Sequence, residues 1–145
     1  MTTHEDYWLA MSRGAKILDL DRAESLRLLA AKKVGRLGFL HEGAPMIMPM
    51  NFTVTDDRVV FRTLAHGLAA RAVNTAVAFE VDDIDDFLEA GWSVVVTGTA
   101  ELLTEAELGR LRGDGDAPDP WAEGPRTLFV AIPIDQVTGR QLIPR

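Results

Sequence analysis

Apolar and polar residues alternate between Pro49 and Thr63 in a pattern that predicts two β-strands joined by a tight turn. Apolar side chains recur at every second position in both halves of this segment, as they do where one face of a strand is buried. Asp56-Asp57 separates the halves and is typical of a two-residue turn. The alternating apolar residues are Phe52 and Val54 before the turn, and Val59 and Phe61 after it.

Extended segments of this kind account for most of the chain. Glu42-Gly43 is typical of a hairpin turn between the first two of them. The segment GWSVVVTGTA is too apolar for a solvated edge strand, and its Gly98 stands where a side chain would block the close approach of another backbone. The predicted strands cover residues 34–41, 44–55, 58–63, 76–81, 91–103 and 126–136.

Three short helices are predicted between these strands. Asp21 and Thr104 each precede a Glu at the third following position, which is the pattern of a capping box at a helix start. Apolar residues at helical spacing predict another helix over Ala65–Val73. Residues 112–125, rich in Gly, Pro and Asp, are interpreted as a loop. We therefore expect a mainly β fold, a six-stranded antiparallel β-barrel with short flanking helices.

The length of 145 residues predicts one domain. We interpret residues 1–20 as an N-terminal arm and residues 21–145 as that domain. The absence of cysteine excludes disulfides and thiolate chemistry, and the three histidines lack metal-binding spacing. The N-terminus does not follow the signal-peptide pattern, and the longest apolar runs have only the length of a strand. We expect a cytoplasmic protein that does not associate with a membrane.

The distribution of charge argues against nucleic-acid binding. The formal net charge is −7, and no Lys or Arg occurs between Arg71 and Arg110. A phosphate backbone requires a basic stripe, which this pattern lacks. The acids of that interval are Glu80, Asp82, Asp83, Asp85, Asp86, Glu89, Glu101, Glu105 and Glu107.

Several predicted strands carry apolar residues on both faces, which is more than one small domain can cover. Residues 46–50 and 94–96 are the main examples. The surplus apolar surface favours a homodimer.

The pattern VGRLGF…PMNF…FRT…FEVD…GWSVVVTG…TGR resembles the pyridoxamine 5′-phosphate oxidase-like family, whose fold is the FMN-binding split β-barrel. The resemblance covers roughly residues 21–143. It implies a two-fold homodimer with a flavin in each of two clefts between the subunits.

The resemblance also implies which residues bind the cofactor. Arg62 and Thr63 match the pair that binds the flavin phosphate, and the helix expected after them adds a positive helix end. The strand that lies along the flavin ring corresponds to Met48, Pro49, Met50 and Asn51. Residues that border the same cleft, in part from across the dimer, correspond to Trp92, Ser93 and Trp121.

The chain departs from the family at one position. Relatives carry a lysine early in the segment after the Arg-Thr pair, where it neutralises the flavin phosphate. The alignment of TLAHGLAAR places Gly67, Leu68 or Ala69 there. Losing one cation weakens phosphate binding by about 1–3 kcal/mol. Arg71 and His66 are the candidates to compensate. The expected cofactor is FMN, and the deazaflavin F420 or no cofactor remain as alternatives.

The function implied by the resemblance is that of an FMN- or F420-dependent oxidoreductase acting on a small molecule, with the chemistry supplied by the cofactor. No general acid or base stands out, so no catalytic residue is assigned. The alternative is a split-barrel dimer that binds a small ligand or a protein partner without catalysis.

Overall fold

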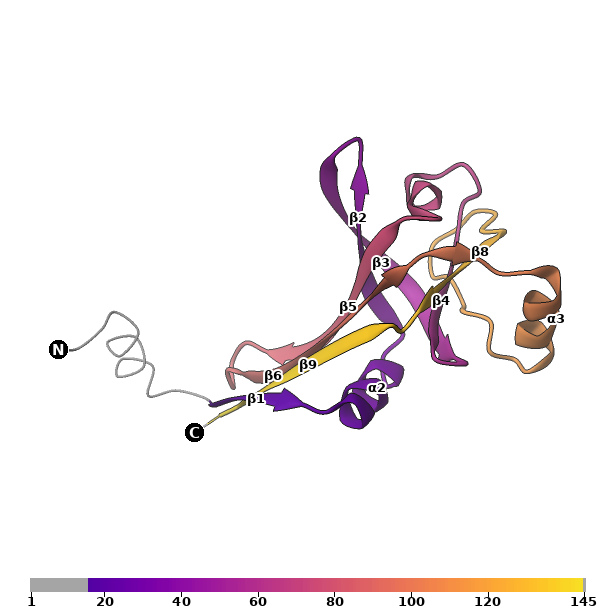
Figure 1. The fold of residues 1–145 in the computed structure, drawn as a ribbon. Coiled ribbons are helices and arrows are strands. Elements are labelled where there is room, and N and C mark those ends of the chain that lie inside the picture. The colour runs from indigo at the N-terminus through magenta and orange to yellow at the C-terminus, as the bar shows by residue number, and fades with distance from the viewer. Residues whose placement is uncertain (1–15, 145) are drawn as a thin grey trace.

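The computed structural model describes residues 16–144, which form one nine-stranded antiparallel sheet, two α-helices and one 3₁₀ helix (Figure 1). The helices are α2 (Arg22–Ala30), η1 (Leu68–Ala72) and α3 (Glu105–Gly113). The strands are β1 (Lys16–Leu20), β2 (Val34–His41), β3 (Ala44–Thr55), β4 (Arg58–Thr63), β5 (Ala76–Asp85), β6 (Ala90–Thr99), β7 (Glu101–Leu102), β8 (Leu128–Pro133) and β9 (Gln136–Ile143).

The sheet closes into a barrel because one stretch of chain belongs to both of its ends. The strand order is β1-β9-β6-β5-β2-β3-β4-β8-β7. Strands β6 and β7 are separated only by Ala100, so a single stretch pairs with β5 through β6 and with β8 through β7. Six strands complete the circle when β6 and β7 are counted as one. The predicted six-stranded barrel is therefore confirmed.

The barrel interior is an apolar core that includes the alternating apolar residues of the β3–β4 hairpin. Phe52 and Phe61 are paired across β3 and β4, and both are buried. The Phe52 ring meets the Phe79 ring edge to face, with 5.0 Å between the ring centroids. On the opposite face of β4 and β8, Val60, Phe129 and Ala131 form a second apolar cluster with Leu111 of α3.

Strands β1 and β9 extend the sheet beyond the barrel. β9 pairs with β6, and β1 pairs only with β9. Helix α2 packs against β9 (Figure 1). Ser25 of α2 lies so close to Gly139 of β9 that a Cβ on the glycine would be 2.4 Å from the serine hydroxyl. Residues 16–20 were expected in the N-terminal arm, but they form β1. The rest of that arm lies outside the described residues.

Three local predictions differ from the structure. The helix expected over Ala65–Val73 is only the 3₁₀ helix η1, which begins after Gly67. The acidic connection expected between the two central strands is mostly strand, because β5 and β6 pair up to Asp85 and Ala90. The strand expected over residues 126–136 ends at Pro133, and a separate strand, β9, follows.

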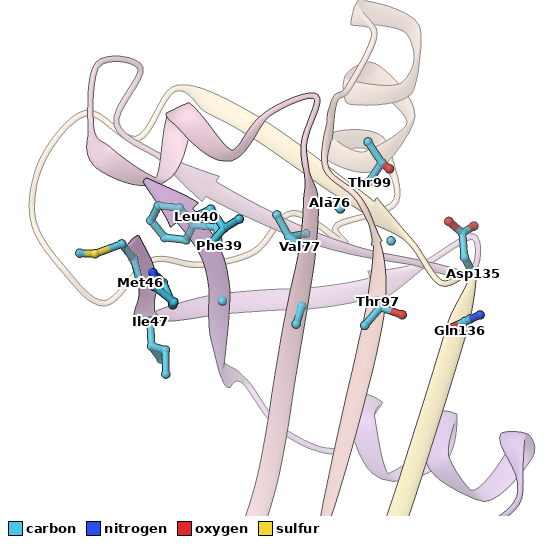
Figure 2. A pocket seen from close by; sticks show the side chains of 14 residues that line it. Phe39, Leu40, Met46, Ile47, Ala76, Val77, Thr97, Thr99, Asp135 and Gln136 are labelled. Atoms are coloured by element: carbon cyan, nitrogen blue, oxygen red, sulfur yellow. The ribbon is translucent and has the colours of Figure 1, made fainter. Parts of the chain in front are cut away.

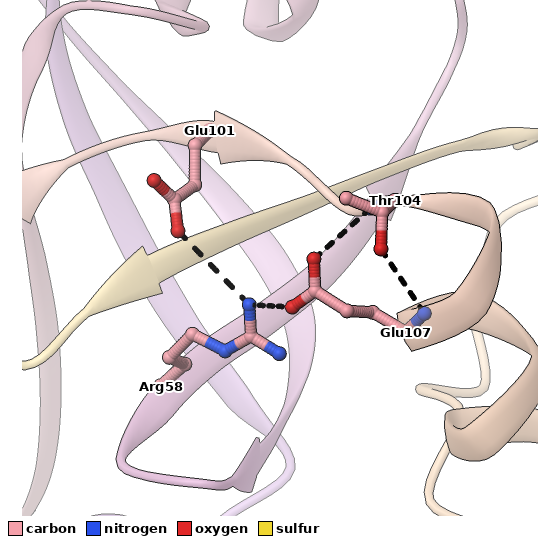
Figure 3. Close-up of polar contacts among 4 residues, drawn as sticks. All are labelled: Arg58, Glu101, Thr104 and Glu107. Atoms are coloured by element: carbon pink, nitrogen blue, oxygen red, sulfur yellow. Dashed lines mark hydrogen bonds and ion pairs between the residues drawn. The ribbon is translucent and has the colours of Figure 1, made fainter.

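The start of α3 has the predicted capping box (Figure 3). The Thr104 hydroxyl accepts a hydrogen bond from the Glu107 amide at 3.1 Å, and the Glu107 carboxylate accepts one from the Thr104 amide at 3.2 Å. Arg58 of β4 donates a hydrogen bond to the Glu107 carboxylate. Its Nη1 also lies 4.0 Å from the Glu101 carboxylate. These contacts, led by the backbone of Thr104, lower the pKa of Glu107. No helix within residues 16–144 has the length and apolar character needed to cross a membrane.

Candidate functional site

A cavity of about 160 Å³ lies beside the C-terminal end of β4, between β3 and the loop that follows α3. The structure brings together in it the segment 48–51 and the pair Arg62 and Thr63. The rest of its lining comes from the segment after β4 and from the loop, namely Leu64, Gly67, Leu68, Ala69, Pro118, Pro120, Ala122 and Arg126. Six of the residues predicted from the sequence therefore share one concave site.

Arg62 is held in place by two contacts from neighbouring elements. Its Nε donates a hydrogen bond to the carbonyl oxygen of Arg126 at 3.0 Å. Its guanidinium carbon lies 4.8 Å from the centre of the Phe129 ring, a cation–π distance. Neither contact neutralises the charge, so the cationic group stays available at the cavity wall.

The loop after α3 forms one side of the cavity and is anchored on β3. The Trp121 amide donates to the Asn51 side-chain oxygen at 2.9 Å, and the Thr53 hydroxyl donates to the carbonyl oxygen of Asp116 at 2.8 Å. Pro118 is fully buried between these two anchors. Asn51 therefore positions the loop through its side chain, a role that the sequence did not indicate.

Arg126 also lines the cavity and was missed at the sequence level. Its Nη1 donates to the carbonyl oxygens of Ala122 and Glu123, so the guanidinium group is tied to its own loop. The loop composition of Gly, Pro and Asp predicts a turn but not the direction in which that turn folds back. An isolated arginine in such a loop gives no periodic signal.

The remaining predicted residues lie elsewhere. His66 and Arg71 are exposed, and neither lines the cavity. Trp121 is 71% exposed and contributes its backbone amide to the anchoring of the loop rather than its ring to the cavity lining. The positive helix end expected after Thr63 is not present in that form, because η1 has only five residues.

Trp92 and Ser93 line a different cavity, also of about 160 Å³, near the start of β6. Its other walls include Ile84, Arg140 and Leu142. The two sets of residues that the family resemblance assigns to one flavin are therefore in separate cavities of a single chain.

An open groove of about 600 Å³ runs across the outer surface of β2, β3, β5 and β6 (Figure 2). Directly paired residues share a face of a sheet, and the row of Ile47, Gly38, Ala78 and Thr97 is paired in this way across the groove. The small side chains at Gly38 and Ala78 leave the surface hollow in the middle. Ile47 is 73% exposed and Leu40 62% exposed along one edge.

A charged cluster lies on the same face of the sheet, next to the groove. One nitrogen of Arg36 is 3.0 Å from the carboxylates of both Glu80 and Asp82. Burial of its carboxylate, together with the neighbouring Asp82, raises the pKa of Glu80 to about 7 despite the attraction of Arg36. Asp82 is paired directly with Ser93 of β6, so this cluster lies between the groove and the cavity of Trp92.

Within residues 16–144, no group of three or more His, Asp or Glu side chains is arranged to hold a metal ion.

Comparisons with known proteins give a consistent result. A family model described as pyridoxamine 5′-phosphate oxidase matches residues 21–141. The uncharacterized protein Rv0080 of Mycobacterium tuberculosis is 35% identical over an alignment of 134 residues, and the match covers 88% of this chain and 87% of that protein.

Solved structures show the same likeness in three dimensions. A FAD-binding protein of Mesorhizobium loti matches with a TM-score of 0.70 and 28% identity, over 89% of this chain and 98% of that one. A FAD-binding protein of Mycobacterium smegmatis matches with a TM-score of 0.66 and 29% identity, over 87% and 98% of the two chains. The predicted split-barrel class is thereby confirmed.

Proposed function

Because the chain belongs to the pyridoxamine 5′-phosphate oxidase family, we propose that it binds a flavin nucleotide in the cavity between β3, β4 and the loop after α3. The observation that carries this proposal is that two arginines, Arg62 and Arg126, line that cavity and have no carboxylate partner among the described residues. A ligand phosphate supplies the missing negative charge.

The rest of the cavity fits the other parts of a flavin. Met48, Met50 and Leu68 give it an apolar wall of the kind that an aromatic ring system requires, and Thr63 adds a hydroxyl. FMN is the simplest cofactor with this combination of ring and phosphate. FAD is equally in scope, since two similar proteins are described as FAD-binding. The deazaflavin F420 carries a phosphate as well and is kept as a third candidate.

We also propose that the site is completed by a second copy of the chain. The cavity of about 160 Å³ is smaller than the roughly 300–1,000 Å³ of pockets that enclose drug-sized ligands. Trp92 and Ser93, which family resemblance assigns to the same ligand, line another cavity of the monomer. A dimer formed across the outer groove and the adjoining face of β5 and β6 lets one subunit supply Trp92 and Ser93 to the other.

The proposed activity is that of an oxidoreductase on a small molecule. A bound flavin supplies the two-electron chemistry, and the protein binds it, orients it and excludes water from it. In this scheme Arg62 anchors the phosphate, and the backbone of segment 48–51 positions the ring. Trp92 of the second copy shapes the side on which a substrate enters.

Cofactor binding is tested by an absorption spectrum of the purified protein and by fluorescence titration with FMN, FAD and F420. We expect saturable binding of at least one cofactor, weakened about ten- to a hundredfold in Arg62→Ala. Arg71→Ala is the matched control, because Arg71 is exposed and outside the cavity. Failure of all three cofactors to bind at high micromolar concentration would leave the non-catalytic ligand-binding dimer as the better function.

The dimer is tested by sedimentation analysis of Ile47→Glu. Ile47 is exposed in the single chain, so this change places a charge in the proposed interface without disturbing the core. We expect a monomer that also loses flavin affinity. Leu102→Glu, at another exposed apolar position, serves as the control and is expected to remain dimeric. If Ile47→Glu remains dimeric, the dimer interface does not lie across the outer groove.

A further inference from the structure

We propose that Arg126 takes the place of the lysine that this chain lacks and acts as the second phosphate-binding cation. The inference rests on the proposed flavin site and identifies a residue within it that family resemblance does not supply. It also assigns the loop after α3 a direct part in binding, because Arg126 belongs to that loop rather than to the segment where relatives carry the lysine.

The partly buried arginines of this chain differ in whether a carboxylate is paired with them. Three arginines of residues 16–144 are half-buried, namely Arg58, Arg62 and Arg126. Arg58 is close to two carboxylates, those of Glu101 and Glu107. Arg62 and Arg126 have no carboxylate of a described residue within 4.0 Å, although the chain contains 22 acidic residues. Partly desolvated charges are normally paired, so an external anion is the missing partner.

Arg62 and Arg126 both keep N–H groups that make no hydrogen bond to a described residue. The Arg62 Nε–H is directed at the carbonyl oxygen of Arg126, which ties the two residues together at the wall of one cavity. A guanidinium carries five N–H bonds. Arg62 directs only its Nε–H to the described protein, and Arg126 directs only its Nη1. The other N–H groups of both are available to phosphate oxygens.

The two residues considered from the sequence are less suitable. Arg71 and His66 are exposed and do not line the cavity. Arg71 lies in η1, whose buried residues Ala69 and Ala72 fix the opposite side of that helix against the core. The charge lost with the lysine is therefore replaced from the loop.

A purely structural role of Arg126 is the competing explanation. Its contacts with the carbonyl oxygens of Ala122 and Glu123 stabilise the loop, and the loop covers the site. The two roles differ in ligand dependence. Loss of a phosphate contact lowers the affinity only for ligands that carry a phosphate. Loss of order in the loop lowers the affinity for every ligand of the cavity.

The experiment compares FMN with riboflavin, which has the same ring but no phosphate. Wild type, Arg126→Ala, Arg126→Lys and Arg71→Ala are titrated with both by fluorescence, and circular dichroism verifies that each variant is folded. For Arg126→Ala we expect a ten- to hundredfold weaker affinity for FMN and less than a threefold change for riboflavin. Arg126→Lys keeps the charge and is expected to retain most of the preference for FMN. Arg71→Ala is expected to match the wild type.

Three outcomes would overturn the inference. These are an unchanged FMN affinity in Arg126→Ala, an equal loss for FMN and riboflavin, and a wild type with no preference for FMN. Should the wild type bind neither compound, nor FAD or F420, the proposed function fails, and thermal unfolding with inorganic pyrophosphate then tests separately whether Arg126 binds a phosphate group. Stabilisation of the wild type but not of Arg126→Ala then supports it, and equal behaviour of the two proteins contradicts it.

Discussion

Gly98 of β6 lies against the carbonyl oxygen of Pro133 in β8, so closely that a Cβ on the glycine would be 2.3 Å from that oxygen. The contact occurs just before the stretch passes from pairing with β5 to pairing with β8, which is the step that closes the barrel. The close backbone approach that the sequence predicts at Gly98 is therefore made by the carbonyl group of Pro133.

Gly98→Ala is therefore expected to lower the free energy of unfolding by at least about 1–3 kcal/mol, as overpacked sites do. Gly109→Ala in α3 is the control. Its Cβ would meet nothing within 4 Å, so no loss of stability is expected. Urea unfolding of the two variants measures the difference. Equal stabilities would show that β6 and β8 move apart easily.

Ser25→Ala is expected to stabilise the protein. The Ser25 hydroxyl is buried between α2 and β9 and has no hydrogen-bond partner among the described residues. A buried polar group without a partner costs about 1–3 kcal/mol, so its removal is expected to raise the free energy of unfolding by about 1 kcal/mol.

Thr53→Ala provides the contrast to this change, because its hydroxyl donates to the carbonyl oxygen of Asp116. Loss of that bond is expected to lower the free energy of unfolding by about 0.5–1.5 kcal/mol. A destabilised Ser25→Ala would contradict the assignment of its hydroxyl as unpaired.

The capping box of α3 gives a third prediction (Figure 3). Thr104→Ala removes the acceptor for the Glu107 amide and is expected to lower the free energy of unfolding by about 1 kcal/mol. Thr104→Ser keeps the hydroxyl and is expected to remain near the wild type. Urea unfolding at neutral pH measures both. If the serine variant is as unstable as the alanine variant, packing of the threonine methyl group is responsible instead.

The raised pKa of Glu80 predicts a pH dependence of stability. Its pKa is about 7 in the folded protein and close to the ordinary 4.5 in the unfolded chain, so the folded state holds a proton between these values that the unfolded state has released. The contribution of Glu80 to stability consequently falls as pH rises from about 4.5 to about 7. In Glu80→Gln this fall is expected to disappear. Urea unfolding at pH 5, 6, 7 and 8 compares the two proteins, and parallel pH profiles would contradict the raised pKa.

The parts of the fold that were predictable are those with a strong local pattern. The alternation around Phe52 and Phe61 and the helix-start signals at Asp21 and Thr104 correspond to observed elements. The helical spacing over Ala65–Val73 was misleading, because apolar residues that meet the core in a short 3₁₀ turn have similar spacing over so few residues. Strand β9 was missed because Gln136–Ile143 is mostly exposed and lacks a long apolar run.

The candidate site was predictable only where its residues are continuous in sequence with a recognisable strand. Arg62 and segment 48–51 belong to the hairpin whose pattern was evident, and they share a cavity. Arg126 reaches that cavity because the Asn51 side chain and the Trp121 amide fix the fold of the loop. Contacts of this kind join residues that are far apart in the chain, and the pattern of apolar residues within either segment does not predict them.

The position of β1 determines when the sheet can be completed during synthesis. Among the described strands, β1 is the first to leave the ribosome and β9 is the last, yet β9 is the only partner of β1. Growth of the chain therefore cannot build this sheet progressively from its N-terminal end. The edge of β1 therefore stays unpaired until β9 has emerged, and an unpaired strand edge is open to other strands during that interval.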